Sequence, residues 1–469
     1  MMKTTRLLMM AVLGLTLAAC SKDDDALTQQ PAEQQPAEQM TGQGKSIPFT
    51  ATISIGEGGT TRALADGGTT LTATWEEGEK VALIHNGVSD EMTVASVSSG
   101  VATITGDITG SPSDGDAVTI IYPATAAKGT TGEVKGNLLK TQEGTLAAVS
   151  EKYDVRKGSG TLTVTGESAT LTDDVAMANQ YAVWKLTVPT ARNLCILADN
   201  EAIAGATLEG EQEGSVFTVA VPAVTSKTIT VVASDDDNNC YFYKNPKTIS
   251  LAAGKYYRSE PAMTPLGTDE DAEGGVYKIT GTYSGFLNTV TIPAGKTAVL
   301  SGATISGSSH INCESNVTII LMGSNSITVS DNNPAIIPGG SGMLTITGTG
   351  SLTATGGLFN PGIGPHCGNS EGGTCGDILI CGGTIDVTGG NYKSSNYSGA
   401  GIGTGNRGTC GNITITTGVT SVTARKGSGK GNYIARNSIG YGAPLSTCGT
   451  VTIGGSTGYK TDDTYTYEP

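Results

Sequence analysis

Histidine is scarce in this chain, which has only three: His85, His310 and His366. None of them stands near a pair of residues that could serve as nucleophile and base. Carboxylates are absent from Val387 to Thr461, and apolar residues at helical spacing are almost absent after position 20. These absences argue against histidine-dependent catalysis and against a helical fold.

Short runs of alternating Val, Ile and Thr fill the chain instead, with turn residues every eight to twelve positions. The 67 glycines are about twice the usual share, without a collagen period or a disordered composition. The pattern predicts an all-β protein, with a sandwich or barrel in its N-terminal half followed by a right-handed parallel β-helix. Two N-terminal β-sandwich subdomains are the arrangement implied by the family resemblance described below.

The formal net charge of −15 argues against nucleic acid as a partner. The stretch without carboxylates nevertheless holds a group of cations: Lys393, Arg407, Arg425, Lys426, Lys430, Arg436 and Lys460.

Residues 1–19 have the pattern of an export signal, with Lys3 and Arg6 ahead of an apolar run that ends at Leu17. The small residues before Cys20 resemble the lipobox of bacterial lipoproteins, which implies acylation (palmitate) of Cys20. Lipid chains at roughly 0.8 kcal/mol per buried methylene would anchor the chain durably. The acidic run after Cys20 resembles the signal for the outer face of the outer membrane. A plain secretory signal and a merely solvated tether are the alternatives.

Residues 20–46 carry a repeated Gln-Pro-Ala-Glu-Gln sequence and are expected to form a flexible tether. Two sandwiches are then predicted, at 47–170 and 171–265, with the stretch from Ala169 to Gln180 as a helical turn or loop between them.

Several short motifs in this region occur in a recognisable order: Thr61-Arg62-Ala63, Trp75-Glu76-Glu77-Gly78-Glu79, Ile121-Tyr122-Pro123-Ala124 and Ile249-Ser250-Leu251-Ala252-Ala253-Gly254. Together they resemble the fimbrillin-like surface lipoproteins of Gram-negative bacteria. The resemblance implies a cell-adhesion role in a fimbrium (pilus), with other pilus subunits as partners.

Residues 266–275 form an acidic linker, and 276–469 change to a repeated unit. Each unit has a short element with a central isoleucine, which is Gly-Ile-Gly at 362–364 and 401–403, and a strand of the Ile-x-Ile type. A second strand follows in three units, and in two of them it leads into Gly-Gly. The central isoleucines Ile336, Ile363, Ile402 and Ile439 mark this period, which predicts stacked coils with Ile and Val inside and Thr outside. The unit resembles a bacterial β-helix family with a carbohydrate-binding role.

Cysteines recur at one position of the coil, so Cys375 and Cys410 are expected to stack about 4.8 Å apart. A Cys375–Cys410 disulfide is compatible with that spacing, although a reduced ladder is favoured. Cys195 and Cys240, in the second sandwich, are a second candidate pair. No metal site is predicted, because the cysteines near His366 match no closed zinc spacing.

Loops after the second strand of each unit carry aromatic and basic residues. The candidate glycan-binding residues are Tyr392, Tyr397, Tyr433, Tyr441, Arg425, Lys430 and Arg436. Tyrosine rings stack on sugars and cations pair with carboxylates or sulfates. The alternative is that these tyrosines only cover coil edges.

A surface-tethered polysaccharide lyase or hydrolase is the second hypothesis, and it would bring in calcium. The repeats supply only Asp331, Glu371, Asp377 and Asp386, which are scattered. We therefore expect a non-enzymatic adhesin with no cofactor.

Arg62 lies in a small, polar segment that a protease could reach. In the resembled pilins, cleavage at an arginine opens a groove that a partner's strand fills. A surface arginine without such a role is equally compatible. The following β-helix makes a role as pilus tip or stand-alone adhesin fit better than a shaft role.

Overall fold

The computed structural model describes residues 46–55, 65–66, 71–72, 74–209, 215–268, 275–285, 289–368, 372–391, 398–428, 435–443 and 445–469. Contacts divide the chain into the units Met1–Gly42 and Gln43–Pro469, and all described residues belong to the second. Within them the chain is all-β, and its helical turns are short: η1 (Ala124–Ala126), α1 (Leu146–Ala148) and η2 (Val149–Tyr153). None of these turns is long or apolar enough to cross a bilayer.

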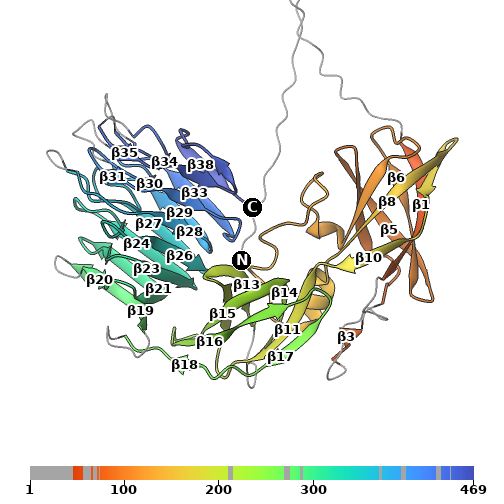
Figure 1. Cartoon of the computed structure of the whole chain (residues 1–469), viewed down its shortest axis with the longest axis horizontal. Coiled ribbons are helices and arrows are strands. Elements are labelled where there is room, and N and C mark those ends of the chain that lie inside the picture. The colour runs from red at the N-terminus through yellow and green to blue at the C-terminus, as the bar shows by residue number, and fades with distance from the viewer. Residues whose placement is uncertain are drawn as a thin grey trace, which may run out of the picture. The chain divides into compact units, whose positions relative to one another are not determined.

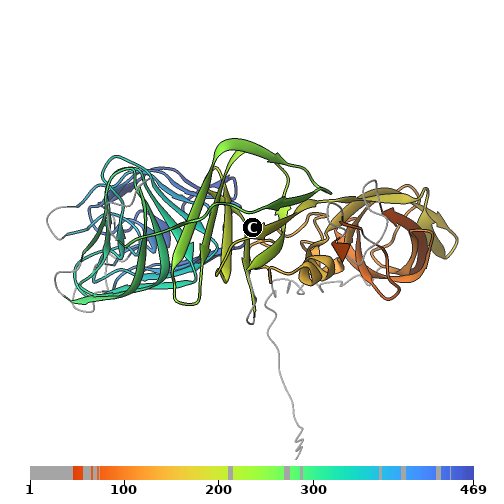
Figure 2. The same ribbon diagram turned by 90° about the horizontal axis from the view of Figure 1, so that it is seen from below.

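The first region is one sheet whose strand order is β10-β1-β6-β5-β4-β7-β8-β9. Its strands are β1 (Ile47–Ile55), β4 (Lys80–His85), β5 (Val88–Ser98), β6 (Val101–Ile108), β7 (Ala117–Tyr122), β8 (Arg156–Thr165), β9 (Ser168–Leu171) and β10 (Val175–Asn179). Because β10 pairs with both β1 and β8, the sheet closes on itself like a barrel (Figure 2). A separate hairpin joins β2 (Ala65–Asp66) to β3 (Leu71–Thr72).

This closure differs from the predicted sandwich. The stretch from Ala169 to Gln180, predicted as a turn or loop, contains most of β9 and all of β10. Strand β10 lies beyond the predicted boundary at residue 170 and belongs to the first sheet. Alternate residues of β1, including Phe49 and Ile53, are buried in the interior that the closed sheet surrounds.

The second region has two sheets over one hydrophobic core. Strands β14 (Val216–Pro222), β11 (Tyr181–Thr187) and β17 (Tyr256–Ser259) form one sheet. The other sheet contains β13 (Glu201–Thr207), β12 (Asn193–Ala198), β15 (Val224–Ser234), β16 (Cys240–Leu251) and β18 (Thr264–Pro265). Trp184 and Phe217 from the first sheet meet Ile196 and Val231 from the second in this core.

The third region is a stack of parallel strands on three faces (Figure 1). The first face contains β19 (Val276–Gly285), β21 (Thr297–Gly307), β23 (Val317–Met322), β26 (Leu344–Gly348), β28 (Ile378–Ile380), β32 (Ile413–Ile415) and β36 (Val451–Ile453). The second face continues from the C-terminal half of β21 into β24 (Ser324–Val329), β27 (Ser351–Thr355), β29 (Thr384–Thr388) and β33 (Ser421–Arg425).

Short strands make up the third face and a nearby corner. They are β20 (Val290–Ile292), β22 (Ile311–Cys313), β25 (Ile336–Ile337), β30 (Ile402–Gly403) and β34 (Ile439–Gly440), with β31 (Thr409–Cys410) and β35 (Thr447–Cys448) at the corner. Ile363 bridges Ile336 and Ile402, so the predicted isoleucine column is confirmed.

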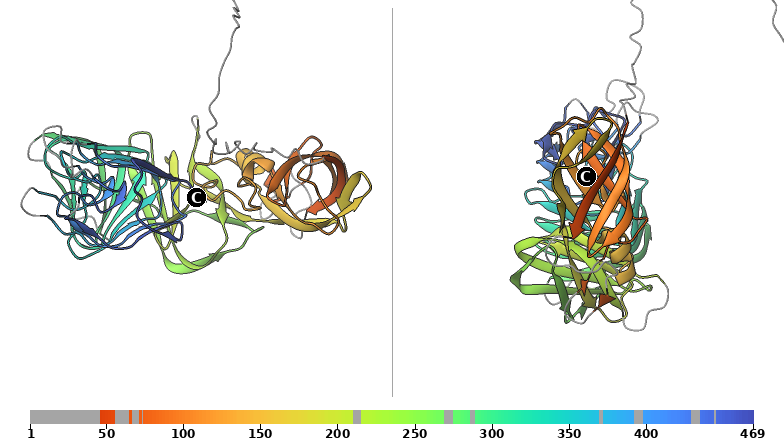
Figure 3. Two further views of the ribbon diagram at one scale, coloured as in Figure 1. Left: turned by 90° about the horizontal axis from the view of Figure 1, so that it is seen from above. Right: turned by 90° about the vertical axis from the view of Figure 1, so that its right-hand side faces the viewer.

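Register places the apolar side chains of successive rungs over one another. On the first face Ile346 pairs with Ile380, Ile380 with Ile415, and Ile415 with Ile453. All four are at most 3% exposed and belong to one core cluster. The successive rungs run from green to blue in Figure 3.

The last rung is covered by strands that run in the opposite direction. Strand β37 (Ser456–Thr457) pairs antiparallel with β36, and β38 (Thr464–Tyr467) pairs antiparallel with β33. Lys460 forms an antiparallel bridge with Ile439 on the third face. The strands of the last rung are therefore paired, and the two outermost strands of this sheet are only two and four residues long.

Candidate ligand-binding face

The second face of the stack presents a regular array of side chains to solvent. Strands of this face bury every second residue, such as Ile327, Ala354 and Val387, and the residues between them point outward. The register of the parallel pairs sets the outward residues in two columns. The first column is Thr282, Thr304, Ser326, Thr353, Asp386, Thr423 and Thr466; the second is Ser284, Ser306, Thr328, Thr355, Thr388, Arg425 and Thr464.

We call these two columns the hydroxyl face, because every member except Asp386 and Arg425 is Ser or Thr. All of its members are exposed or half-buried. Neighbouring strands lie about 4.8 Å apart and alternate residues of one strand about 7 Å apart, so the hydroxyls form a nearly rectangular grid. Each hydroxyl both donates and accepts hydrogen bonds, which suits a ligand rich in hydroxyl groups.

One ion pair interrupts this grid. The guanidinium of Arg425 donates to the carboxylate of Asp386, which lies one strand away in the neighbouring column. Both side chains are about 40% exposed, so the cation remains reachable from solvent. Arg425 is the last residue of β33 and marks the corner where the predicted loops leave the sheet.

Four of the seven candidate glycan-binding residues fall outside the described part of the chain. Tyr392, Tyr397, Lys430 and Tyr433 lie outside the described residues, as do Cys20 and Arg62.

Arg436 and Tyr441 flank β34 on the third face, away from the second-face columns. Arg436 is exposed, and its backbone N–H donates to the carbonyl of Gly442. Tyr441 packs edge-on against Tyr459, with 5.0 Å between the ring centroids. These two predicted residues therefore belong to the covered end of the stack, whereas Arg425 belongs to the hydroxyl face.

The eight described cysteines are free thiols. Cys195 on β12 and Cys240 on β16 pair across their strands with Val232 and Ser234, and both sit in one buried cluster. Cys375 and Cys410 are stacked on neighbouring rungs as predicted, and their Sγ atoms lie 3.2 Å apart.

The carboxylates of the stack are engaged in separate local contacts. Asp377 accepts from the backbone N–H of Asn412 at 2.7 Å, Asp331 accepts from the Asn333 amide, and Asp386 holds Arg425. Glu371 lies outside the described residues. In the described ranges, no three His, Cys, Asp or Glu side chains gather where they could hold a metal ion.

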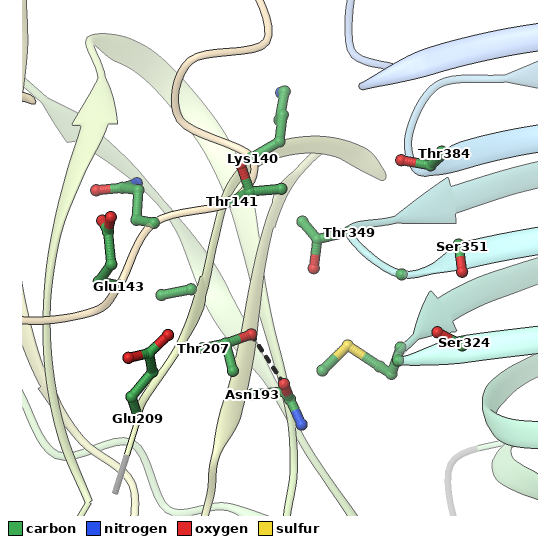
Figure 4. A pocket seen from close by; sticks show the side chains of 15 residues that line it. Lys140, Thr141, Glu143, Asn193, Thr207, Glu209, Ser324, Thr349, Ser351 and Thr384 are labelled. Atoms are coloured by element: carbon green, nitrogen blue, oxygen red, sulfur yellow. Dashed lines mark hydrogen bonds between the residues drawn. The ribbon is translucent and has the colours of Figure 1, made fainter. Parts of the chain in front are cut away.

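A polar cavity of about 480 Å³ lies where β12 and β13 approach the stack (Figure 4). One wall is a further hydroxyl column, in which Ser324 pairs with Ser351 and Ser351 with Thr384. The opposite wall carries Glu143 and Glu209.

The pKa values of two charged groups at this cavity are shifted by their surroundings. Partial burial raises the pKa of Glu143, but hydrogen bonds from Lys152 and the Tyr153 hydroxyl outweigh it and lower the pKa overall. Burial lowers the pKa of Lys140 to about 8, and its ammonium donates to the Ala202 carbonyl. This cavity was not predicted from the sequence, because its walls come from segments up to 244 residues apart, from Lys140 to Thr384.

No family model matches the chain, and no curated protein matches it. Solved structures match it at low identity, and each of the three named here covers less than half of it. A "putative cell adhesion protein" from Bacteroides uniformis ATCC 8492 is 11% identical, with 46% of this chain and 91% of that chain covered and a TM-score of 0.28. A fimbrial assembly protein from Parabacteroides distasonis ATCC 8503 is 10% identical, with 46% and 90% covered and a TM-score of 0.24. A fimbrial protein from Bacteroides ovatus ATCC 8483 is 11% identical, with 46% and 48% covered and a TM-score of 0.23.

Proposed function

We propose that this chain is a surface adhesin whose third region is a right-handed parallel β-helix that binds glycans through its hydroxyl face. The observation that carries the proposal is the in-register array of outward Ser and Thr side chains.

The lattice spacing indicates how a ligand would lie. A linear polysaccharide running along the stack would meet a new pair of hydroxyls about every 4.8 Å. Each contact is individually weak. A sugar hydroxyl that bonds to Thr gives up a hydrogen bond to water, so the net gain in free energy is only about 1 kcal/mol. Repetition over several rungs supplies the affinity.

Arg425 gives the face a preference for anionic glycans. Its side chain sits near the C-terminal end of the grid and is half-exposed beside Asp386, while the next residue, Lys426, pairs with Asp463. A carboxylate or sulfate on the glycan would compete with Asp386 for the guanidinium.

The remaining elements of the proposal concern anchoring. Cys20 would carry the lipid anchor in the outer membrane, 20–46 would act as tether, and the first two regions, a barrel and a two-sheet sandwich, would present the β-helix. Assembly with other pilus subunits, as a tip component processed at Arg62, belongs to the same proposal.

A glycan array probed with the whole chain, with and without calcium, tests the proposed binding. We expect retention on linear, hydroxyl-rich glycans, strongest on anionic members and weakened by salt through Arg425. Retention on no glycan would overturn the proposal. Release of shortened or unsaturated sugar products would instead favour the polysaccharide lyase or hydrolase.

A further inference from the structure

Three thiols stand in one column at a corner of the stack. Thr374 bridges Thr409 in parallel, which sets Cys375 beside Cys410, and Cys410 pairs directly with Cys448 between β31 and β35. The Cys375 thiol donates to the Cys410 sulfur, with 3.2 Å between the two Sγ atoms. The Cys410 and Cys448 thiols also interact with each other.

The three thiols differ in their access to solvent. Cys375 and Cys410 are buried, whereas Cys448 is half-buried; it is the only one of the eight described cysteines that is not buried. Cys448 lies in the last strand of its corner, where the Tyr459 hydroxyl donates to its carbonyl at 2.9 Å. Cys448 is therefore the most accessible residue of the column for an external reagent.

The middle thiol has two possible partners and can bond to one at a time. A disulfide at Cys410 leaves either Cys448 or Cys375 as a thiol. Parallel neighbours have Cα atoms about 4.8 Å apart, inside the range that disulfides span. The adjacent Cys375 and Cys448 thiols, together with burial, raise the pKa of Cys410, so it is a poor first nucleophile toward an external reagent.

We propose that Cys448 is a modification site: the entry thiol of a three-cysteine relay that passes oxidation inward to Cys375 and Cys410. The oxidant is a small external disulfide, RSSR. The Cys448 thiolate attacks one sulfur of RSSR, which forms a mixed disulfide and releases one RSH after proton uptake.

The relay then moves through two exchanges. Cys410 attacks the Cys448 sulfur, forms the Cys410–Cys448 disulfide and releases the second RSH. Cys375 next attacks the Cys410 sulfur, and Cys448 leaves as a thiol again. In total two cysteine thiols lose two electrons and two protons, and one RSSR becomes two RSH.

The Cys375–Cys410 disulfide is the final product of the relay, because both of these residues are buried. External thiols cannot reach a Cys375–Cys410 disulfide, whereas a bond at Cys448 stays open to reduction. The regenerated Cys448 thiol then remains available for attachment to another thiol-bearing molecule.

The test treats the whole folded chain with glutathione disulfide and follows each cysteine by peptide mapping. We expect glutathione on Cys448 first, followed by a Cys375–Cys410 disulfide with Cys448 as a free or glutathionylated thiol. Cys448→Ser should slow oxidation of the other two at least tenfold, and Cys448→Ala should do the same. Cys410→Ser should hold glutathione on Cys448 with no internal disulfide, and Cys375→Ser should stop at Cys410–Cys448.

Cys313→Ser is the matched control, because Cys313 is buried in β22 outside this column and its loss should leave the sequence of products unchanged. The relay is overturned if the Cys448 variants oxidise as fast as the parent. It is also overturned if glutathione stays on Cys448 of the parent without any internal disulfide, or if another described cysteine reacts first.

Discussion

Asp386 and Arg425 form an ion pair across two rungs, although 39 residues separate them. Asp386 lies beside Thr423, and Arg425 lies two residues further along that same strand. The pair is therefore a diagonal contact on the outer surface. It ties the one cation of the hydroxyl face to the one carboxylate there.

Removing this carboxylate should free the cation for a ligand. We expect Asp386→Asn to strengthen retention on anionic glycans several-fold. Because both side chains are about 40% exposed, the pair contributes no more than about 1 kcal/mol to stability, and the variant should remain folded. Affinity measured at low and high salt checks this prediction, with a neutral glycan as control. Unchanged or weaker retention of anionic glycans would contradict it.

Gly403 is needed where one rung of the third face meets the next. Its φ is +127°, and a Cβ would overlap the carbonyl of Gly440 on the following rung. Gly403→Ala should therefore lower the free energy of unfolding by at least about 2 kcal/mol. Gly455→Ala is the control, since Gly455 has φ +83° but open space around it and should cost only about 1 kcal/mol. Equal losses in urea unfolding would show that the close approach is not what matters.

Glu79 gives the first region a pH-dependent stability. Burial raises its pKa to about 7 from the ordinary 4.5, with a smaller contribution from the nearby Asp154. An acid whose pKa is raised by folding binds its proton more tightly in the native state. Stability from this group is therefore full below pH 4.5 and declines as pH rises through 7.

The variant Glu79→Gln removes this titration. The free energy of unfolding of the variant minus that of the parent should be larger at pH 8 than at pH 5. Urea unfolding of both proteins at both pH values measures this difference. Glu77→Gln, at an exposed neighbour, serves as control and should follow the parent. A parent-like pH profile for Glu79→Gln would contradict the assignment.

Strands β37 and β38, which we call the antiparallel cap, occupy the edges of the last rung, where strands of other chains could otherwise pair. Deleting residues 454–469 removes β37 and β38 and exposes the edges of β36 and β33. We expect the shortened chain to self-associate in size-exclusion chromatography at concentrations where the full chain does not. A deletion variant that elutes like the parent would show that the cap is dispensable for this purpose.

The strand pairing of the repeat region could be predicted, because each strand pairs with the equivalent strand of the next unit. A fixed order of Ile-x-Ile and Gly-Ile-Gly elements gives the isoleucine columns as soon as units are aligned, and the outward Thr positions follow from alternation. The outward Thr columns of the hydroxyl face are thus predictable from the sequence, whereas a binding role was predicted only for tyrosines and cations in and near the loops.

Closure of the first sheet could not be predicted in the same way. It depends on β10 returning to both β1 and β8, and Val175 and Ile53 are more than one hundred residues apart. Nothing in their local alternation distinguishes a closed sheet from two facing ones. Alignment of the repeats does place Asp386 between Thr353 and Thr423, as the register shows. The ion pair with Arg425 was not predicted, because a diagonal contact also depends on the side-chain conformations of both residues.

The proposed role of the hydroxyl face is tested most directly by replacing its hydroxyls with methyl groups of the same shape. The triple variant Thr353→Val, Thr355→Val and Thr388→Val keeps β-branched side chains that favour strands. Its control is Thr414→Val with Thr452→Val, at outward positions on the first face of the same stack. We expect the triple variant to lose at least tenfold in affinity for the best glycan from the array and the control to bind like the parent. Equal affinities for parent and triple variant would contradict glycan binding by this face.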